Sequence, residues 1–400
     1  MIHKTNGLTV KVLDRLLGSL GSELLTGDGL SLHTAEERRR ALRERAAKIA
    51  NEMEYAERER WLTLVELQNY DGSINDPKEA IRWGLAMTRR LSQFITPLEP
   101  DEWHEDEDNE AGEHHRARSA VRDALRQIGY LPGTPLDVFH GTNTVPQNLQ
   151  MLGLWVVTLD RRASPNQFLP VIVRLDGSSQ AVRAMYPGAT GWLPYAEALL
   201  EVAHSQLELG LPADRFPSFL DQILEDSTIA GATLLMCHAQ NTRQIWPWLT
   251  NQNISTEGLT WGRGPQKPIK HRELRVARVR DSTRDEVPQW YAFGNGEMRL
   301  PSGLFKQRER VYLSLQGKTA AMKSGRTIAK LDRSNLTIAV PRVIELFLPI
   351  LQDSDDADQW AVVVHRLRQM AGHHDEATRL PLPLHLARGL TEYVAVCRNG

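Results

Sequence analysis

Acidic side chains are scarce within the apolar segments of this 400-residue chain. Hydrolysis of a phosphodiester bond by paired divalent cations needs several carboxylates that converge on cations about 4 Å apart. The strand expected at residues 152–159 contains no acid, and His238 follows the apolar strand 232–237, where a carboxylate would be expected. The candidate catalytic residues are Asp160, Asp176, Asp281 and His238. We therefore predict that the chain has no nuclease activity of its own and no resident metal site.

Basic side chains gather in two segments, residues 263–284 and 306–333. Arg278 and Arg280 stand two apart on a strand expected at 273–280, so they share one face of it. The second segment includes a stretch rich in small residues and without acids, which holds Lys318, Lys323 and Arg326. Such residues either bind a phosphate backbone or protect a solvated edge strand. Charge alone leaves both interpretations open.

Three polar residues, Gln240, Asn241 and Arg243, follow directly after the apolar strand 232–237. Folds of the α/β class place ligand-contacting groups at this end of a strand, and an arginine there offers a planar fork for a phosphate or a carboxylate. The alternative is an ion pair between Arg243 and Glu392 that locks the C-terminal helix onto the sheet. The nearby Trp246 and Trp248 are expected to pack in the core rather than to stack on bases.

The overall composition is that of an ordinary soluble protein, with 41% apolar residues, 24% charged residues and a formal net charge of −2. This charge gives no support to nucleic-acid binding, so any basic site must be local. The two cysteines are too few for a disulfide framework or a cysteine zinc site. The N-terminus does not resemble a signal peptide, and no apolar run is long enough to span a membrane. We expect a cytoplasmic protein without a membrane partner.

The first third of the sequence predicts helices and a small α/β unit. Residues 34–60 are predicted to form one long helix, because Thr34 and Glu37 make a capping box before an apolar stripe. We expect a connecting helix, with a partner-binding coiled coil as the alternative. A strand at 61–67, a helix from Asp76 and a strand at 92–95 follow. The acidic residues 101–115 lack periodicity and are predicted to be a solvated insertion before a helix at 116–128.

The rest of the chain predicts a mixed sheet with helices. Strands are expected at 152–159, 169–175, 180–186, 232–237, 273–280 and 310–316, and helices at 194–209, 340–352, 357–370 and 384–396. The order is three antiparallel strands, a helix, and later strands alternating with helices. That order is typical of an RNase H-like fold, although periodicity alone supports only the α/β class.

Three separated motifs resemble the bacterial PIWI family called pPIWI-RE. They are ATLLMCHAQNTRQIWPWLTN at 232–251, TRLPLPLHLARGLTEYV at 378–394 and DPKEAIRWGLAMTRRLSQFITP at 76–97, and the likeness extends over about residues 61–398. The resemblance implies an α/β architecture in which a helical N-terminal segment (1–60) and a small MID-like domain (61–135, with the acidic insertion) precede an RNase H-like PIWI domain (136–400). Family members carry a longer region before MID, so we expect a truncated or split version.

The resemblance also implies residue roles. Arg243 corresponds to the family's arginine and Glu392 to its glutamate, while Lys78 and Gln93 resemble the MID residues that bind the 5′-phosphate of a guide strand; Arg82, Arg89 or Arg90 are alternatives for the charge. Including Gln240, Asn241, Arg278, Arg280, Lys318, Lys323 and Arg326, these residues form our predicted nucleic-acid-binding set.

The function implied by the resemblance is that of an Argonaute-like component of bacterial defence that binds a guide or target strand. The expected partners are single-stranded RNA or DNA or an RNA–DNA hybrid, together with a helicase and a separate restriction-type nuclease. Mg²⁺ is expected only with a guide phosphate or with nuclease activity. Two alternatives of other classes remain: a Mg²⁺-dependent RNase H-like endonuclease and a protein–protein adaptor without nucleic acid.

Overall fold

The computed structural model describes most of the chain. The residues outside the description are 1, 6–7, 12–17, 54, 56–60, 69, 71–72, 98–116, 118, 132–134, 160–166, 178, 180, 205–209, 262–268, 270, 282–285, 288–291, 294–302, 316–320, 323–337, 340–342, 371–377 and 395–400. The chain divides into two compact units, Met1–Glu99 with Gly400, and Pro100–Asn399. Our predicted domain boundaries at 60 and 135 stay predictions.

Two helices form the body of the first unit. α1 (Ala35–Glu52) begins with the predicted capping box, in which Thr34 accepts from the backbone N–H of Glu37 while the Glu37 side chain accepts from that of Thr34. The helix ends at Glu52, so the prediction of one helix to residue 60 is wrong. The backbone N–H of Met53 donates to the carbonyl oxygen of the buried Ile49, but the backbone of Met53 is extended, so the helix does not continue past this residue. α1 packs against α2 (Lys78–Met87).

The strands of the first unit confirm the predicted α/β unit. β3 (Trp61–Glu66) and β4 (Arg90–Ile95) pair in parallel, and α2 connects them. Val65, Ile81 and Leu85 bury their side chains against Ile49 of α1. α1 and α2 cross closely, because a Cβ on Gly84 would lie 2.7 Å from the carbonyl oxygen of Ala46. A hairpin of β1 (Ile2–Thr5) and β2 (Leu8–Lys11) lies near the N-terminus.

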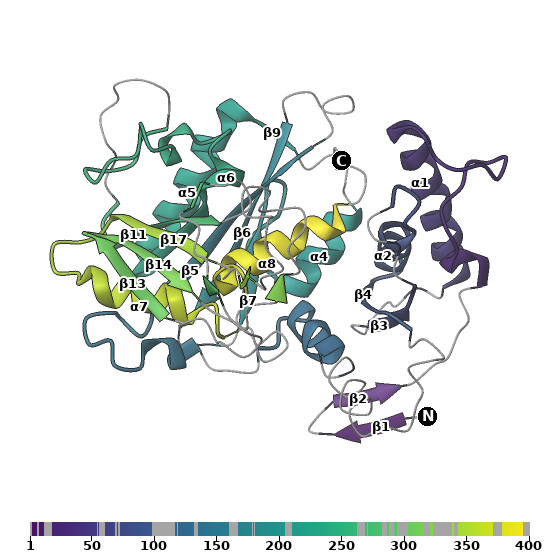
Figure 1. The fold of residues 1–400 in the computed structure, drawn as a ribbon, viewed down its shortest axis with the longest axis horizontal. Helices are drawn as coiled ribbons and strands as arrows, with labels where there is room; N and C mark the ends of the chain where they lie inside the picture. Colours follow the sequence, from purple (N-terminus) through teal and green to yellow (C-terminus); the bar gives the residue numbers. More distant parts are fainter. Residues whose placement is uncertain are drawn as a thin grey trace. The chain divides into compact units, whose positions relative to one another are not determined.

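A large mixed sheet forms the centre of the second unit (Figure 1). Its order is β13 (Gly303–Arg308), β14 (Val311–Leu315), β17 (Val343–Ile350), β11 (Leu274–Asp281), β10 (Thr233–His238), β5 (Gln150–Thr158), β6 (Gln167–Asp176), β7 (Val182–Met185) and β8 (Leu193–Pro194), with β9 (Leu211–Pro212) beside β6. β5, β6 and β7 are antiparallel neighbours, whereas β10 runs parallel to β5 and to β11. Three short strands, β12 (Ala292–Phe293), β15 (Ala321–Met322) and β16 (Ile338–Ala339), form a separate sheet. The central strand order confirms the predicted RNase H-like fold.

Helices cover both faces of the central strands. α5 (Phe216–Ala230) packs on one face, where Phe216 and Leu220 join Leu152 and Leu154 in the core. α8 (Leu382–Leu390) crosses the other face in front of β5 and β6 (Figure 1). Its approach is close, because a Cβ on Gly153 would lie 2.3 Å from the carbonyl carbon of Pro383. The alternation of side chains along β5 therefore gives each face its own helix.

The remaining helices lie around this sheet. α4 (Tyr195–His204) packs against α8, α6 (Ala239–Thr242) follows β10, and α7 (Ala357–Arg366) contacts β13 and β17. Residues 119–127 are helical as predicted, and Gly129 after them has a φ of +81°. The acidic insertion 101–115 lies outside the described residues. In the part of the chain that the structure describes, no helix has the length and apolar character needed to cross a membrane.

One predicted helix is a strand. Residues 340–352 were predicted to be helical, but Val343–Ile350 form β17, which pairs with β11 and with β14. Neighbours cover both faces of this strand, so nearly all of its positions bury their side chains and the two-residue alternation disappears from the sequence. Such a run cannot be distinguished from a buried helix by periodicity. The helix α5 and the strand β13 were not predicted.

Candidate nucleic-acid interface

The polar amides that follow β10 join it to the strands on either side. Gln240 donates from Nε2 to the backbone oxygen of Asp281 (2.7 Å) and accepts from its backbone N–H (3.1 Å). Asn241 donates from Nδ2 to the backbone oxygen of Val156 (2.8 Å) and accepts from its N–H (2.7 Å). The two side chains thus continue the hydrogen bonding of the sheet past the point where β10 ends. Their predicted role in binding nucleic acid stays a prediction.

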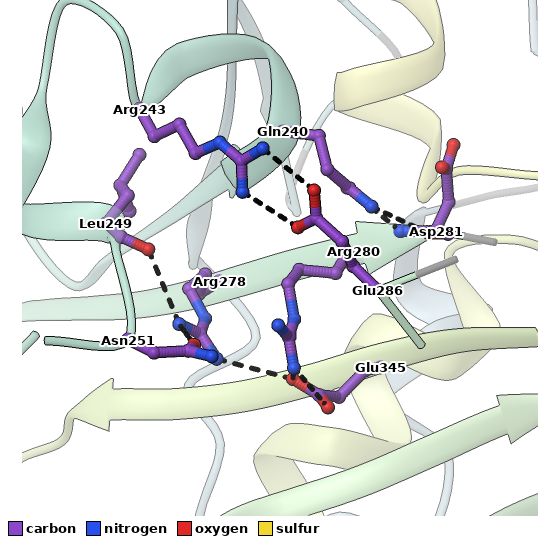
Figure 2. Close-up of polar contacts among 9 residues, drawn as sticks. All are labelled: Gln240, Arg243, Leu249, Asn251, Arg278, Arg280, Asp281, Glu286 and Glu345. Carbon is purple, nitrogen blue, oxygen red and sulfur yellow. Dashed lines mark hydrogen bonds and ion pairs between the residues drawn. The ribbon is translucent and has the colours of Figure 1, made fainter. Parts of the chain in front are cut away.

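Arg243 pairs with a carboxylate that the sequence did not single out. Its Nη1 and Nη2 atoms each donate to one carboxylate oxygen of Glu286, and both distances are 2.8 Å (Figure 2). The ion pair with Glu392 that we considered is therefore wrong, because Glu286 takes the guanidinium fork. The side chain of Arg243 is 34% exposed and that of Glu286 is 22% exposed. This two-point geometry is the one in which arginine binds carboxylates and phosphates alike.

Arg278 and Arg280 lie on one face of β11, as predicted from their spacing. Both approach Glu345 of β17: the shortest distance is 3.3 Å from Arg278 and 2.6 Å from Arg280. Arg278 also donates to Oδ1 of Asn251 at 2.7 Å (Figure 2). The edge-strand interpretation is wrong for this segment, because β11 lies between β10 and β17. It fits the second basic segment, where β13 is an edge strand that carries the exposed Lys306 and Arg308. Burial lowers the pKa of Arg278 to about 10, and the neighbouring Arg280 also acts in that direction.

A cavity of about 410 Å³ opens among these arginines. It is lined by Ala239, Arg243, Leu249, Thr250, Asn251, Arg278, Arg280 and Glu286. The lining comes from α6, from the segment after it, from β11 and from the segment around Glu286. Its volume falls within the roughly 300–1,000 Å³ of small-ligand sites. Three guanidinium groups therefore face one small space at the end of β11.

A second polar group lies on the opposite face of the sheet. Nε2 of His238 is 3.4 Å from a carboxylate oxygen of Asp281, and Nε of Arg379 is 3.1 Å from the same oxygen. Trp155 of β5 stacks on the His238 ring, with 4.9 Å between the ring centroids. The guanidinium of Arg388, from α8, lies 5.9 Å from the Trp155 ring. This group contains a single carboxylate among its named members.

The predicted catalytic residues do not all meet. His238 and Asp281 end neighbouring parallel strands and lie together. Asp176 ends β6 opposite Gln150, at the other end of β5, and pairs with Arg174 at 3.4 Å. Asp160 is outside the described residues. Within the described ranges, no three His, Cys, Asp or Glu side chains are grouped so as to hold a metal ion.

Lys78 of the first unit lies beside Phe94, the residue after Gln93. Its Nζ is 5.2 Å from the centre of the Phe94 ring, and the guanidinium of Arg82 is also 5.2 Å from it. Gln93 donates to the backbone oxygen of Phe94 at 3.3 Å. Of the alternatives, Arg82 lies with Lys78, whereas Arg90 is buried over the Trp61 ring at 4.7 Å.

Other members of the predicted set lie apart. Glu392 belongs to the 3-10 helix after α8 and acts with burial to raise the pKa of Tyr195. Lys318, Lys323 and Arg326 lie outside the described residues. The tryptophans confirm the packing interpretation: Trp246 and Trp248 are fully buried, and their rings stack with centroids 5.0 Å apart.

Two family models match the chain. Residues 151–395 match the RNaseH domain of pPIWI_RE, and residues 7–136 match the MID domain of pPIWI_RE. The chain belongs to this family. The MID match includes α1 and continues past the division between the two compact units into the helix at 119–127. The Argonaute-like order of MID and RNase H-like PIWI domains in pPIWI_RE proteins is thus present.

The chain also matches solved structures of Argonaute and Piwi proteins. A Marinitoga piezophila Argonaute in complex with 5′ OH guide RNA shares 11% identity, with a TM-score of 0.44 over 84% of this chain and 41% of that one. Aa-Ago with externally-bound siRNA shares 10% (TM-score 0.47; 91% and 43%), and Drosophila Piwi shares 9% (TM-score 0.42; 90% and 42%). The pPIWI_RE chain therefore spans about two fifths of the length of these proteins. A search of curated proteins returned no significant match.

Sequence reasoning missed the carboxylates that pair with these arginines. Glu345 was hidden because its strand was predicted as a helix, and Glu286 lies in a basic region where arginines dominate the pattern. Asn251 ends the segment that resembles the family, but it carries no signal of its own. The sequence offers one clue. One strand face carries more arginines than acids, which predicts that carboxylates from elsewhere in the fold lie nearby.

Proposed function

We propose that this pPIWI_RE chain binds a guide or target strand, as RNA, as DNA or as an RNA–DNA hybrid, without cutting it. The observation that carries the proposal is the match to a MID domain and an RNase H-like domain in succession. The basic residues around Phe94 in the first unit support it. So do the three arginines that line the cavity at the end of β11, since arginine forks suit phosphates.

The absence of cutting is supported by the distribution of acids. Two-cation hydrolysis needs several carboxylates around the cations. Among the described residues, the end of β10 and β11 brings together His238 and Asp281, and Arg379 already pairs with that carboxylate. An arginine in this position competes with a cation for the oxygen. We therefore assign cutting to a separate restriction-type nuclease. A helicase is proposed as a further partner in bacterial defence. Mg²⁺ is proposed to bind the terminal phosphate of the strand.

The proposal is tested by binding of the purified full chain to single strands of RNA and DNA with Mg²⁺ present. Strands with a 5′-phosphate are expected to bind more tightly than strands with a 5′-hydroxyl, and both are expected to stay intact. Lys78→Ala is expected to remove most of the preference for the 5′-phosphate, because it removes a cation beside Phe94. The matched control is Lys48→Ala, which removes an exposed lysine of α1.

Two outcomes would contradict the proposal. Shortened strands on a denaturing gel would favour the Mg²⁺-dependent nuclease, and Asp281→Asn should then abolish the cutting. Failure of every strand to bind at low salt would favour the protein–protein adaptor.

A further inference from the structure

The cavity beside β11 contains an arginine whose charge is incompletely paired. Arg278 is only 5% exposed, and its Nε atom has no hydrogen-bond partner. Its other contacts are the 2.7 Å bond to Asn251 and longer approaches to Leu249 and Glu345, at 3.4 and 3.3 Å. A buried donor without a partner destabilises the folded chain unless a ligand supplies one. The Arg278 side chain lines the cavity, so an acceptor bound there lies beside this guanidinium group.

The charges around the cavity favour an anion. Arg243, Arg278 and Arg280 contribute three positive charges, and their partners Glu286 and Glu345 contribute two negative ones. One positive charge is in excess in this partly closed space of about 410 Å³, which favours an anion over a neutral or cationic ligand. A phosphodiester carries one negative charge and would replace the charge of one carboxylate without changing this balance. The cavity has room for a phosphate group, because its volume is more than ten times the roughly 30 Å³ of a water molecule.

Glu286 occupies the position that such an anion would take on Arg243. Its two oxygens fill the guanidinium fork at 2.8 Å, as the oxygens of a phosphate would (Figure 2). Both side chains are partly exposed, and a partly exposed pair contributes little to stability. An incoming phosphate can therefore displace Glu286 at low cost. Arg280, by contrast, stays engaged with Glu345, which accepts from its Nε and Nη2 atoms at 2.9 and 2.6 Å.

We infer that this cavity is a phosphate-binding subsite in which Arg278 and Arg243 hold one phosphate group while Glu286 acts as a displaceable internal substitute for it. The chemistry fits either a phosphodiester of a bound strand or a free phosphate-bearing ligand. The first source rests on the proposed function, and the second does not. In both cases Glu286 lowers the affinity, because the phosphate must replace it.

The test uses full-length chain with Glu286→Gln and two probes, inorganic phosphate and a DNA strand with hydroxyl groups at both ends. The variant removes the competing carboxylate and is expected to bind both probes at least three times more tightly than the parent. Arg243→Gln is expected to weaken binding about tenfold. In the Arg243→Gln background, Glu286→Gln should not raise the affinity, because Glu286 no longer competes with the phosphate for the Arg243 guanidinium. Glu257→Gln, an exposed carboxylate lost from the same unit, is the control for overall charge.

The outcomes separate this inference from the proposed function. A gain for both probes that depends on Arg243 supports a strand phosphodiester in the cavity. A gain for inorganic phosphate in a chain that binds no strand supports a free phosphate-bearing ligand and overturns only the proposed function. Unchanged phosphate and strand affinity in Glu286→Gln overturns the inference, and strand binding by the parent would leave the proposed function standing. Because the variant is expected to gain affinity, misfolding cannot imitate the supporting result.

Discussion

The side chains after β10 illustrate how far residue types alone predict a site. The sequence indicated that Gln240, Asn241 and Arg243 follow an apolar strand, and the structure places them directly after the carboxyl end of β10. The direction of each side chain was not readable, because it depends on which strands lie on either side. Gln240 and Asn241 reach the backbone of β11 and β5. Arg243 reaches Glu286, a residue that only the folded chain brings near.

His365 should make the protein sensitive to acid. Burial lowers its pKa to about 4, and Arg368 and Arg366 act in the same direction. The unfolded chain therefore takes up a proton first as the pH falls, since the ordinary value is 6.5. The stability that the neutral ring contributes is complete above about pH 6.5 and is lost as the pH falls towards 4. At pH 5 we expect a loss of roughly 2 kcal/mol in the free energy of unfolding.

Urea unfolding of the parent and of His365→Asn at pH 7.5 and pH 5 checks this expectation. The variant should lose less stability between the two values than the parent does. His140→Asn replaces an exposed ring of the same unit and serves as the control. An equal pH dependence in His365→Asn and the parent would show that other groups cause the acid sensitivity.

At the scale of elements, the sequence predicted those segments whose burial alternates, whose ends carry caps, or whose apolar run is short and bounded by turn residues. The burial of β7 alternates and α1 begins with the capping box at Thr34, whereas β5 and β6 are buried at nearly every position and were recognisable from the turns that follow them. The failures occur where tertiary contacts replace the local signal. β17 is covered on both faces, and the end of α1 at Glu52 has no breaking residue in the sequence. Neither the partners of a strand nor the loss of helical packing is encoded in spacing alone.

The contact between β5 and α8 predicts a strong effect of a single methyl group. Gly153→Ala places a Cβ about 2.3 Å from the carbonyl carbon of Pro383, and backbone atoms cannot move aside as a flexible side chain can. Overpacking of this kind typically costs about 1–3 kcal/mol, and we expect the upper part of that range. Gly191→Ala, where a Cβ would meet nothing within 4 Å, is the control.

Urea midpoints of the two glycine variants provide the measurement. A Gly153→Ala chain as stable as Gly191→Ala would mean that α8 does not approach β5 as closely as described. A lower midpoint with an unchanged urea dependence would confirm that α8 and β5 fit tightly together.

At the scale of the whole molecule, a net charge of −2 must be reconciled with a polyanionic ligand. Many of the described arginines pair with carboxylates, so strand binding should depend on a few discrete contacts. Our predicted set contains Lys318 and Lys323, which were assigned from the sequence alone. Each cation that neutralises a phosphate adds about −0.7 to the slope of log affinity against log salt for a single strand. Replacing both lysines by alanine should therefore make the slope shallower by about 1.4.

Fluorescence anisotropy between 50 and 300 mM salt measures this slope. The matched control is the double variant Arg43→Ala and Lys48→Ala, which removes two exposed cations of α1. If both double variants leave the slope at the parental value, Lys318 and Lys323 do not contact the strand.

The packing of α8 against Gly153 also bears on how the protein is made. Pro383 follows Gly153 by 230 residues, and a ribosome that adds roughly 5–20 residues per second needs tens of seconds to synthesise that length. Until then, the face of β5 that α8 covers has no partner from this helix. In the nascent chain, the apolar residues of β5 therefore stay uncovered by α8 during this time. We expect a ribosome-associated chaperone to bind this segment.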